Sequence, residues 1–171
     1  MPVLFGLKST GTFRALTYVE TLKIPAILFK EFVNHHRLLG QIKKTQNTIE
    51  FLRQTWLFGE SISTPVQSHI AQQMKLRKYE KGASITCEGL MLVKDGKVEL
   101  SDSGTEMQNS RNEVVEKGGF WGCEQMILNK ALNSNAIALA SSFIYSIAET
   151  EILEQIPIVR WKLLEQAQKR A

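Results

Sequence analysis

Residues 76–148 alternate short apolar runs with turns that contain glycine, and this pattern limits the fold more than any other feature of the chain. Apolar and polar positions that alternate with a period of two predict strands with one buried face. The alternation pauses at residues 117–128, where a glycine-rich segment runs into a stretch that favours a helix. Strands interrupted by a small loop and helix predict a rolled double sheet, which can enclose a pocket for an anionic ligand.

Size and composition are those of an ordinary globular protein. The chain has 171 residues, of which 43% are hydrophobic and 22% charged, so it can bury at least one core. Its apolar runs are much shorter than the roughly 20 residues that span a bilayer, and its first residues lack the pattern of a signal peptide. We therefore expect a cytoplasmic protein that does not insert into a membrane.

The charge pattern does not indicate direct nucleic-acid binding. The net charge is +4 and the isoelectric point is near 9.1, but Lys and Arg are scattered among acidic residues. A nucleic-acid surface would need a basic stripe, usually with exposed aromatic residues. A solvated basic surface is the simpler interpretation.

Side chains that could support catalysis or bind a metal do not form a recognisable set. His35, His36 and His69 fall on predicted helices, whereas a metal site in a barrel needs ligands on inner strands. No Gly-x-Ser-x-Gly string marks a hydrolase. Cys87 and Cys123 are far apart and are expected to be buried small hydrophobic residues. We predict a protein that is not an enzyme, with no metal and no certain cofactor.

The segments around the central region predict further helices and strands. Residues 12–24 have the pattern of two short strands, and Pro25 fits the first turn of a helix. Asp95-Gly96 between two apolar runs predicts a hairpin. The other predicted elements are a helix at residues 63–74, a strand at 135–148, a last strand at 151–156 and a terminal helix from Pro157.

Residues 37–56 contain no proline and a single glycine, Gly40. They predict one long amphipathic helix, or a short helix that turns at Gly40 into a longer one. The apolar stripe of this helix includes Ile42, Ile49, Leu52 and Trp56. The stripe must be covered, and both a homodimer through this helix and packing on the chain's own sheet satisfy that need.

Several short motifs follow one another in a fixed order along the second two thirds of the chain. They are residues 77–85 (RKYEKGASI), 92–98 (LVKDGKV), 119–122 (GFWG), 136–139 (AIAL) and 152–157 (ILEQIP). In this order they resemble a cyclic nucleotide-binding domain, the β-roll shared by catabolite activator protein and the regulatory subunit of protein kinase A. The resemblance covers residues 57–171. It implies a mainly β fold with flanking helices (α+β), a double-stranded β-helix or jelly-roll-like β-roll with N- and C-terminal helices.

The N-terminal part looks like the end of a second copy. Residues 5–6, 11–16, 19–25 and 28–29 line up with residues 121–122, 136–140, 151–157 and 160–161. The repeat implies that residues 1–36 are the C-terminal remnant of a first such domain, 37–57 a connecting helix and 58–171 a second domain. We expect a piece of a longer bacterial tandem protein, whose module regulates an attached transporter, kinase or transcription regulator.

The resemblance also implies a phosphate cassette. In the family, backbone N–H groups of a small helix and one Arg hold the cyclic phosphate, while a Glu binds the ribose. The candidate cassette residues here are Gly119, Trp121, Gly122, Cys123, Glu124, Ser134, Asn135 and Ala136.

Two of the matching positions depart from the family. Cys123 stands at the Glu position, unless Glu124 takes over by a shift of one residue, and Ser134 stands at the Arg position. Lys130 is the only basic residue between them. The resemblance therefore predicts a regulatory or sensor module with a degenerate pocket, and the alternative is a genuine sensor of cAMP, cGMP or another small anionic ligand.

Overall fold

The computed structural model describes residues 2–5, 11–12, 14–59, 62–102, 112–128, 134–148 and 151–170. The chain divides into two compact units, Met1–Lys44 and Thr45–Ala171, and the division falls inside helix α3 (Leu39–Arg53). Within the described ranges, no helix combines the length and the apolar character that are needed to cross a membrane.

The first unit contains the helices α1 (Pro2–Phe5) and α2 (Ala26–His35), and α2 begins directly after Pro25 as predicted. The prediction of two strands at residues 12–24 is wrong for the residues that the structure describes there, which leave out residue 13. Their side chains are exposed, and none of the described strands pairs with them. An alternating pattern without a partner strand is not enough to form a sheet.

Helix α2 does not continue into α3. Arg37 has a φ of 54°, which turns the chain at residues 36–38. The backbone N–H of Leu38 donates to the carbonyl of Val33 at 2.9 Å, a pattern typical of a helix that ends at a left-handed residue. Gly40 lies inside α3, so of the two alternatives for residues 37–56 the structure has the single helix, at Leu39–Arg53, and no turn at Gly40.

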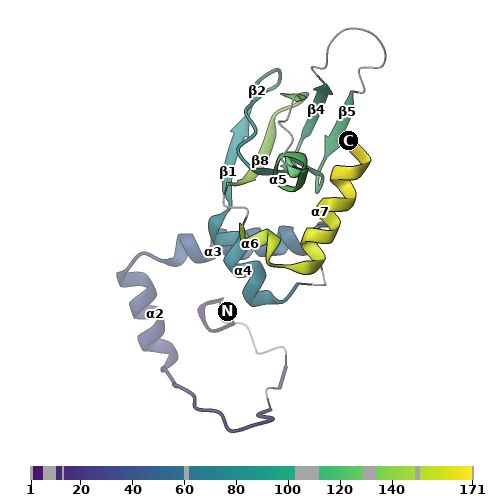
Figure 1. Ribbon diagram of the computed structural model, residues 1–171. Helices are drawn as coiled ribbons and strands as arrows, with labels where there is room; N and C mark the ends of the chain where they lie inside the picture. Colours follow the sequence, from purple (N-terminus) through teal and green to yellow (C-terminus); the bar gives the residue numbers. More distant parts are fainter. Residues whose placement is uncertain are drawn as a thin grey trace. The chain divides into compact units, whose positions relative to one another are not determined.

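The second unit is a roll of two four-stranded antiparallel sheets (Figure 1). The first sheet has the order β1-β8-β3-β6 and the second the order β2-β7-β4-β5. The strands are β1 (Lys75–Tyr79), β2 (Ser84–Ile85), β3 (Leu90–Asp95), β4 (Lys97–Asp102), β5 (Glu113–Glu116), β6 (Phe120–Trp121), β7 (Ser134–Ala138) and β8 (Ser142–Ile147). Consecutive strands fall in different sheets everywhere except at β4 and β5, which pair with each other, so the chain crosses between the sheets repeatedly, as in a jelly roll.

Two predictions about strand connections are wrong. Asp95-Gly96 does not close a hairpin, since β3 pairs with β6 and β8 whereas β4 pairs with β5 and β7. Gly96, with a φ of 95°, carries the chain from one sheet to the other, and a Cβ there would lie 2.2 Å from Oγ of Ser142. The single strand predicted at residues 135–148 is two strands, β7 and β8, in opposite sheets.

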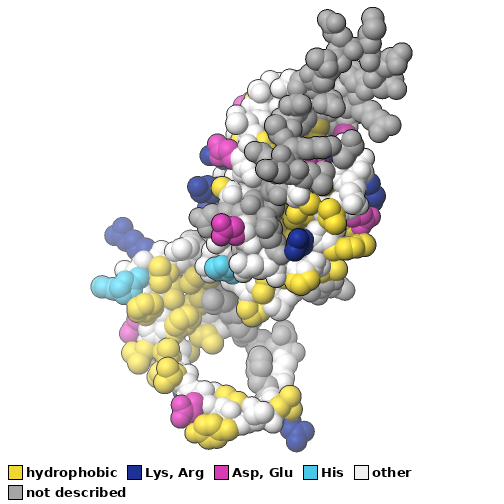
Figure 2. All heavy atoms as spheres, viewed as in Figure 1, with side chains coloured by type: hydrophobic (Ala, Val, Ile, Leu, Met, Phe, Trp, Pro, Cys, Tyr) yellow, Lys and Arg dark blue, Asp and Glu magenta, His cyan; other side chains and the backbone are white. Residues whose placement is uncertain are grey.

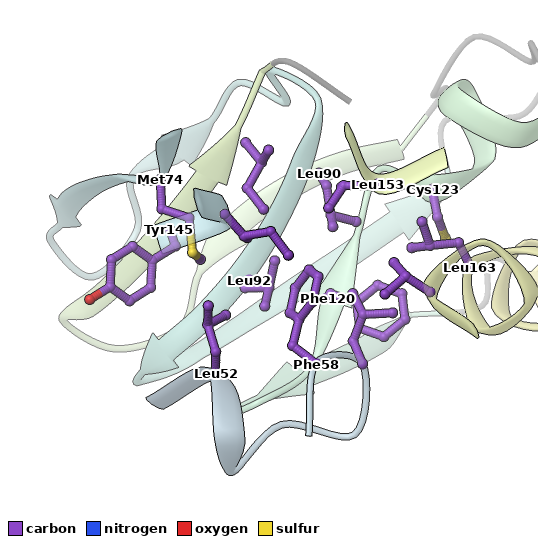
Figure 3. Packing of buried hydrophobic residues seen from close by; sticks show 14 of the residues in the cluster. Leu52, Phe58, Met74, Leu90, Leu92, Phe120, Cys123, Tyr145, Leu153 and Leu163 are labelled. Carbon is purple, nitrogen blue, oxygen red and sulfur yellow. The ribbon is translucent and has the colours of Figure 1, made fainter. Parts of the chain in front are cut away.

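Helices pack against one face of the first sheet through a large apolar cluster. Besides α3, they are α4 (Thr64–Gln73), α5 (Cys123–Leu128), α6 (Glu151–Glu154) and α7 (Pro157–Arg170). Figure 3 shows Leu52 and Phe58 in this cluster together with Leu92 and Phe120 of the sheet. Burial of these side chains, which are at most 7% exposed, holds the helices on the roll.

The prediction of a strand at residues 151–156 is also wrong. Residues 151–154 form α6, and Leu153 is fully buried in the cluster between the helices and the sheet. A pattern of so few residues cannot distinguish a short strand from one helical turn. The terminal helix predicted from Pro157 is confirmed as α7.

A second apolar cluster fills the space between the two sheets. Its buried members are Ile85, Met91, Val93, Val98, Leu100, Val115, Trp121, Ala136, Ala138 and Ile144. The structure therefore confirms the predicted fold class, a mainly β roll of jelly-roll type with helices at both ends.

Candidate ligand-binding cassette

The cassette begins after β5, contains β6 and α5, and is held in place by glycine at Gly122, between β6 and α5. Gly122 has a φ of 92°, and a Cβ there would lie 2.2 Å from the carbonyl oxygen of Gly89 and 3.0 Å from Sγ of Cys87. Gly89 has a φ of 83°, and its own Cβ would lie 2.2 Å from the carbonyl oxygen of Ile147. Residues with a Cβ fit neither position without a backbone shift. Three backbone segments thus lie in direct contact at the start of the cassette helix.

Trp121 occupies the interior of the roll. Its side chain is fully buried in the cluster between the sheets, and its residue pairs with Met91 of β3. The indole Nε1 is buried, and among the described residues no acceptor bonds to it. The space between the sheets beside the cassette therefore holds a large aromatic ring surrounded by apolar side chains.

Cys123 faces the other side of the first sheet. Its side chain is fully buried in the cluster between the helices and the sheet, which also contains Leu163 and Ala167 of α7 (Figure 3). Burial, and secondarily the charge of Glu124, raises the pKa of the Cys123 thiol to about 12. The thiol stays protonated at neutral pH and packs as a small hydrophobic group, as predicted.

Cys87 is half-buried, and its Sγ donates to the carbonyl oxygen of Gly89 at 3.2 Å. Burial and the charge of Glu124 raise its pKa to about 11. Both thiols therefore lie close to the cassette without being activated as nucleophiles. Among the residues that the structure describes, no group of three metal-ligating side chains occurs.

Glu124 binds a cation of the protein itself. Its Oε1 lies 3.3 Å from Nη1 of Arg170, which also donates to the carbonyl oxygen of Phe120 at 2.9 Å. Nε and Nη2 of the same guanidinium donate to the two carboxylate oxygens of Glu113, each at 2.7 Å. Oε2 of Glu124 is buried and has no hydrogen-bond partner in the described part of the chain.

Arg170 is largely buried at this position, with 15% of its side chain exposed. Burial by itself would lower the pKa of its guanidinium, but the hydrogen bonds and charge of Glu113 and the charge of Glu124 outweigh burial and raise it. Arg170 was not among the residues that the sequence suggested. Its only signal was a basic residue in the last turn of a helix, which is common at helix ends.

The remaining candidate residues are distributed over both sheets. The N–H of Gly119 donates to the carbonyl of Glu116 at 2.8 Å, which closes the turn after β5. Ser134 begins β7 and Asn135 is exposed, whereas Ala136 is buried in the same cluster as Trp121. Lys130 lies outside the described residues. The structure thus brings Trp121 and Ala136 together but directs Cys123 and Asn135 elsewhere.

The apolar stripe of the connecting helix does not form one surface. Leu52 is fully buried in the cluster between the helices and the sheet, and Ile49 packs against that cluster. Trp56 follows the end of α3, is 49% exposed, and stacks on the ring of Phe120 with centroids 6.1 Å apart. Ile42, in the first unit, is half-buried. Leu52 packs within its own unit, and a homodimer through this helix stays a prediction.

No family model and no curated protein matches the sequence. Among solved structures, the chain is similar to the regulatory domain of Toxoplasma gondii protein kinase A with cAMP. The TM-score is 0.67 and the identity 14%, over 83% of this chain and 56% of that one. It is also similar to the regulatory subunit of a cAMP-independent protein kinase A from Trypanosoma cruzi bound to guanosine. There the TM-score is 0.60 and the identity 14%, over 82% of this chain and 51% of that one.

The sensor domain of the transcriptional regulator DNR from Pseudomonas aeruginosa is a third similar structure. Its TM-score is 0.58 and its identity 18%, over 74% of this chain and 89% of that one. The chain spans about half the length of the two kinase regulatory chains, 56% and 51%. At these identities the similarity is one of fold, and at that level it confirms the resemblance drawn from the sequence motifs. The chain has the fold of a cyclic nucleotide-binding domain.

Proposed function

We propose that this chain carries a non-catalytic regulatory module of the cyclic nucleotide-binding fold, whose cassette does not bind cAMP or cGMP tightly. One observation carries the proposal: the guanidinium that reaches the cassette, Arg170, is already bound to Glu113, Glu124 and the carbonyl of Phe120. A cyclic phosphate would have to compete with two carboxylates for this cation. Losing a charge-assisted phosphate contact costs about 1.5–3 kcal/mol, or roughly a hundredfold in affinity at the upper end.

Two further features support a degenerate pocket. The indole of Trp121 fills the space between the sheets, where a ligand enclosed by the roll would lie. Cys123, at the position that the family resemblance assigns to a ribose-binding Glu, is directed into the apolar cluster beneath the helices. A thiol that is protonated and buried offers a ribose neither a charge nor an accessible acceptor.

The attachment of α3 to the roll supports the proposed regulatory role. Oγ1 of Thr48 and the hydroxyl of Tyr145 share a buried hydrogen bond of 3.1 Å, and the ring of Phe51 lies 5.4 Å from that of Tyr145. These contacts tie the helix to the middle of the first sheet. We propose that the helix connects the module to an attached effector, so that a change in the roll biases the effector.

The first unit fits the proposal of a preceding copy, with residues 1–36 as its last part, 37–57 as the connection and 58–171 as the second domain. The support is a set of exposed apolar side chains in that unit, and Figure 2 shows hydrophobic side chains, in yellow, gathered at the surface around α2. They are Leu16, Tyr18, Val19, Leu22, Ile24, Ile27, Leu28 and Phe32. Apolar surface of this extent is typical of a segment that packs against another domain.

Thermal denaturation with and without nucleotide tests the proposal. A ligand at about a hundred times its dissociation constant stabilises a protein by about 2.7 kcal/mol. For a domain of this size that is a rise in Tm of roughly 10 °C. We expect cAMP and cGMP at about 1 mM to raise Tm by less than about 1 °C, and a rise close to the linkage value would refute the degenerate pocket.

An uncharged nucleoside is a second candidate ligand, and one observation favours it. Oε2 of Glu124 is a buried acceptor for which the described residues provide no partner, and a ribose hydroxyl could donate to it. A nucleoside has no phosphate, so the missing Arg at Ser134 would not weaken its binding. The T. cruzi regulatory subunit is bound to guanosine. Guanosine in the same thermal assay distinguishes the candidates: a rise with guanosine alone supports the nucleoside sensor.

A further inference from the structure

Arg170 joins four elements of the second unit at one point. It is the last residue of α7, and its guanidinium contacts Glu113 of β5, the carbonyl of Phe120 in β6 and Glu124 in the first turn of α5. The two bonds to Glu113 form a bidentate pair, each 2.7 Å long. A planar guanidinium can satisfy several acceptors at fixed angles, which a lysine ammonium cannot do.

Apolar packing accompanies this ionic contact. Leu163 and Ala167 of α7 are fully buried in the same cluster as Cys123, the first residue of α5. Figure 3 shows Leu163 next to Cys123. Helix α7 and helix α5 lie side by side in Figure 1, with the C-terminal end of α7 near β5. The interface between α7 and α5 therefore combines buried apolar contacts with the ionic contacts of the guanidinium.

The environment makes this a strong contact rather than a surface ion pair. The side chains of Arg170 and Glu124 are each 15% exposed, whereas that of Glu113 is 43% exposed. Because Glu113 is exposed to water, its ion pair with Arg170 contributes less to stability than a buried pair would. The contact to Glu124 is shielded, and removal of Arg170 would leave a buried carboxylate with no cation from the described part of the chain, which is strongly unfavourable.

We infer that Arg170 is a latch that holds the C-terminal helix α7 on the cassette helix α5 and on the roll without a bound ligand. Without a ligand, the module would then keep α7 packed on the cassette helix α5. An effector attached to the module would therefore meet the same conformation of the module at all times. This consequence rests on the proposed function, but the latch contacts themselves do not.

Hydrogen–deuterium exchange of the full chain without nucleotide tests the latch. In Arg170→Gln, we expect the amides of α5 and of the last two turns of α7 to exchange at least about tenfold faster, because these helices open locally. The amides of β3 and β8 should keep their rates and so report that the roll is intact. Arg170→Lys keeps the charge but loses the forked geometry, and an intermediate increase is expected.

The neighbouring residue provides a matched control. Lys169 forms an exposed pair with Glu165 one turn away, at 2.6 Å, so Lys169→Gln changes the same charge at the same helix end with little expected effect. The latch would be refuted if the amides of α5 and α7 exchanged at equal rates in Arg170→Gln and Lys169→Gln. It would also be refuted if the amides of β3 and β8 in Arg170→Gln exchanged faster by the same factor as those of α5 and α7. If Arg170→Gln does not fold, the exchange of Arg170→Lys decides by the same criteria. Because no nucleotide is present, these outcomes are independent of the thermal assay that tests the proposed function.

Discussion

Replacing Gly122 by Ala tests whether the cassette is held in place by its backbone. A residue with a Cβ in the left-handed region, where Gly122 lies with a φ of 92°, costs about 1–2 kcal/mol. In addition, the new Cβ would lie 2.2 Å from the carbonyl oxygen of Gly89. This neighbour is backbone and cannot move aside as a flexible side chain can, so the cassette or the start of β3 must shift.

Gly118 provides a control that separates the two costs. Its φ is 84°, and among the described residues other than its two chain neighbours no atom lies within 4 Å of the position that a Cβ would take. Gly118→Ala should therefore cost only the conformational strain of about 1–2 kcal/mol. Gly122→Ala should cost about 1–3 kcal/mol more, because it overpacks a closed site.

Urea denaturation followed by far-ultraviolet circular dichroism measures the difference. With an m-value of about 2 kcal/mol per molar urea, the midpoint of Gly122→Ala should lie about 0.5–1.5 M below that of Gly118→Ala. Equal midpoints would refute the reasoning, since they would mean that the cassette can move away from Gly89 at no cost. A native-like midpoint for both variants would also show that positive φ is not required at either turn.

Two further predictions concern buried groups. The pKa values of about 11 for Cys87 and about 12 for Cys123 predict that both thiols react with a disulfide reagent at pH 8 at least about tenfold more slowly than in the unfolded chain. Labelling of the folded chain as fast as in urea would contradict the predicted protection of the thiols. Because the folded state keeps these protons to a higher pH than the unfolded state, the free energy of unfolding should also fall as pH rises above about 8.5 towards 11. Thr48→Val should lower the free energy of unfolding by about 1–2 kcal/mol in thermal denaturation, because the hydroxyl of Tyr145 loses its buried partner. An unchanged Tm would mean that this bond contributes nothing to the attachment of α3.

The sequence predicted the roll because its signals are local and strong. Within residues 76–148, runs with a period of two mark the strands and glycines mark several of their ends, each from a few neighbouring residues. Gly89, Gly96 and Gly122 each have a positive φ at a turn, so the residues that identified the turns are the ones that the backbone requires.

The connections between strands could not be read in the same way. Asp95-Gly96 satisfies the local pattern of a hairpin, yet Gly96 packs on Ser142 and carries the chain to the opposite sheet. Which sheet a strand joins depends on partners far along the chain, and short-range patterns carry no information about them. The helical α6 was mistaken for a strand for a related reason, since burial of Leu153 against other helices decides its conformation.

The sequence predicted where the cassette lies but not which charged side chain contacts it. The motif around Gly122 located the cassette, but the cation that contacts it, Arg170, is 46 residues beyond Glu124 in the sequence. A lone Arg at the end of a helix has no pattern that links it to a distant carboxylate. Conversely, Cys123 matched the cassette by position, but its side chain turns to the apolar cluster because the neighbouring helix α7 provides Leu163 there.

Isothermal titration of cAMP into the unmodified chain tests the central claim most directly. The chain has the fold of a cyclic nucleotide-binding domain, and we propose that the groups that would bind the phosphate are either bound within the protein or missing. We expect no saturable heat at nucleotide concentrations up to about 100 µM, which corresponds to a binding free energy weaker than roughly −5.5 kcal/mol. A stoichiometric isotherm with a dissociation constant near 1 µM, or about −8.2 kcal/mol, would contradict it.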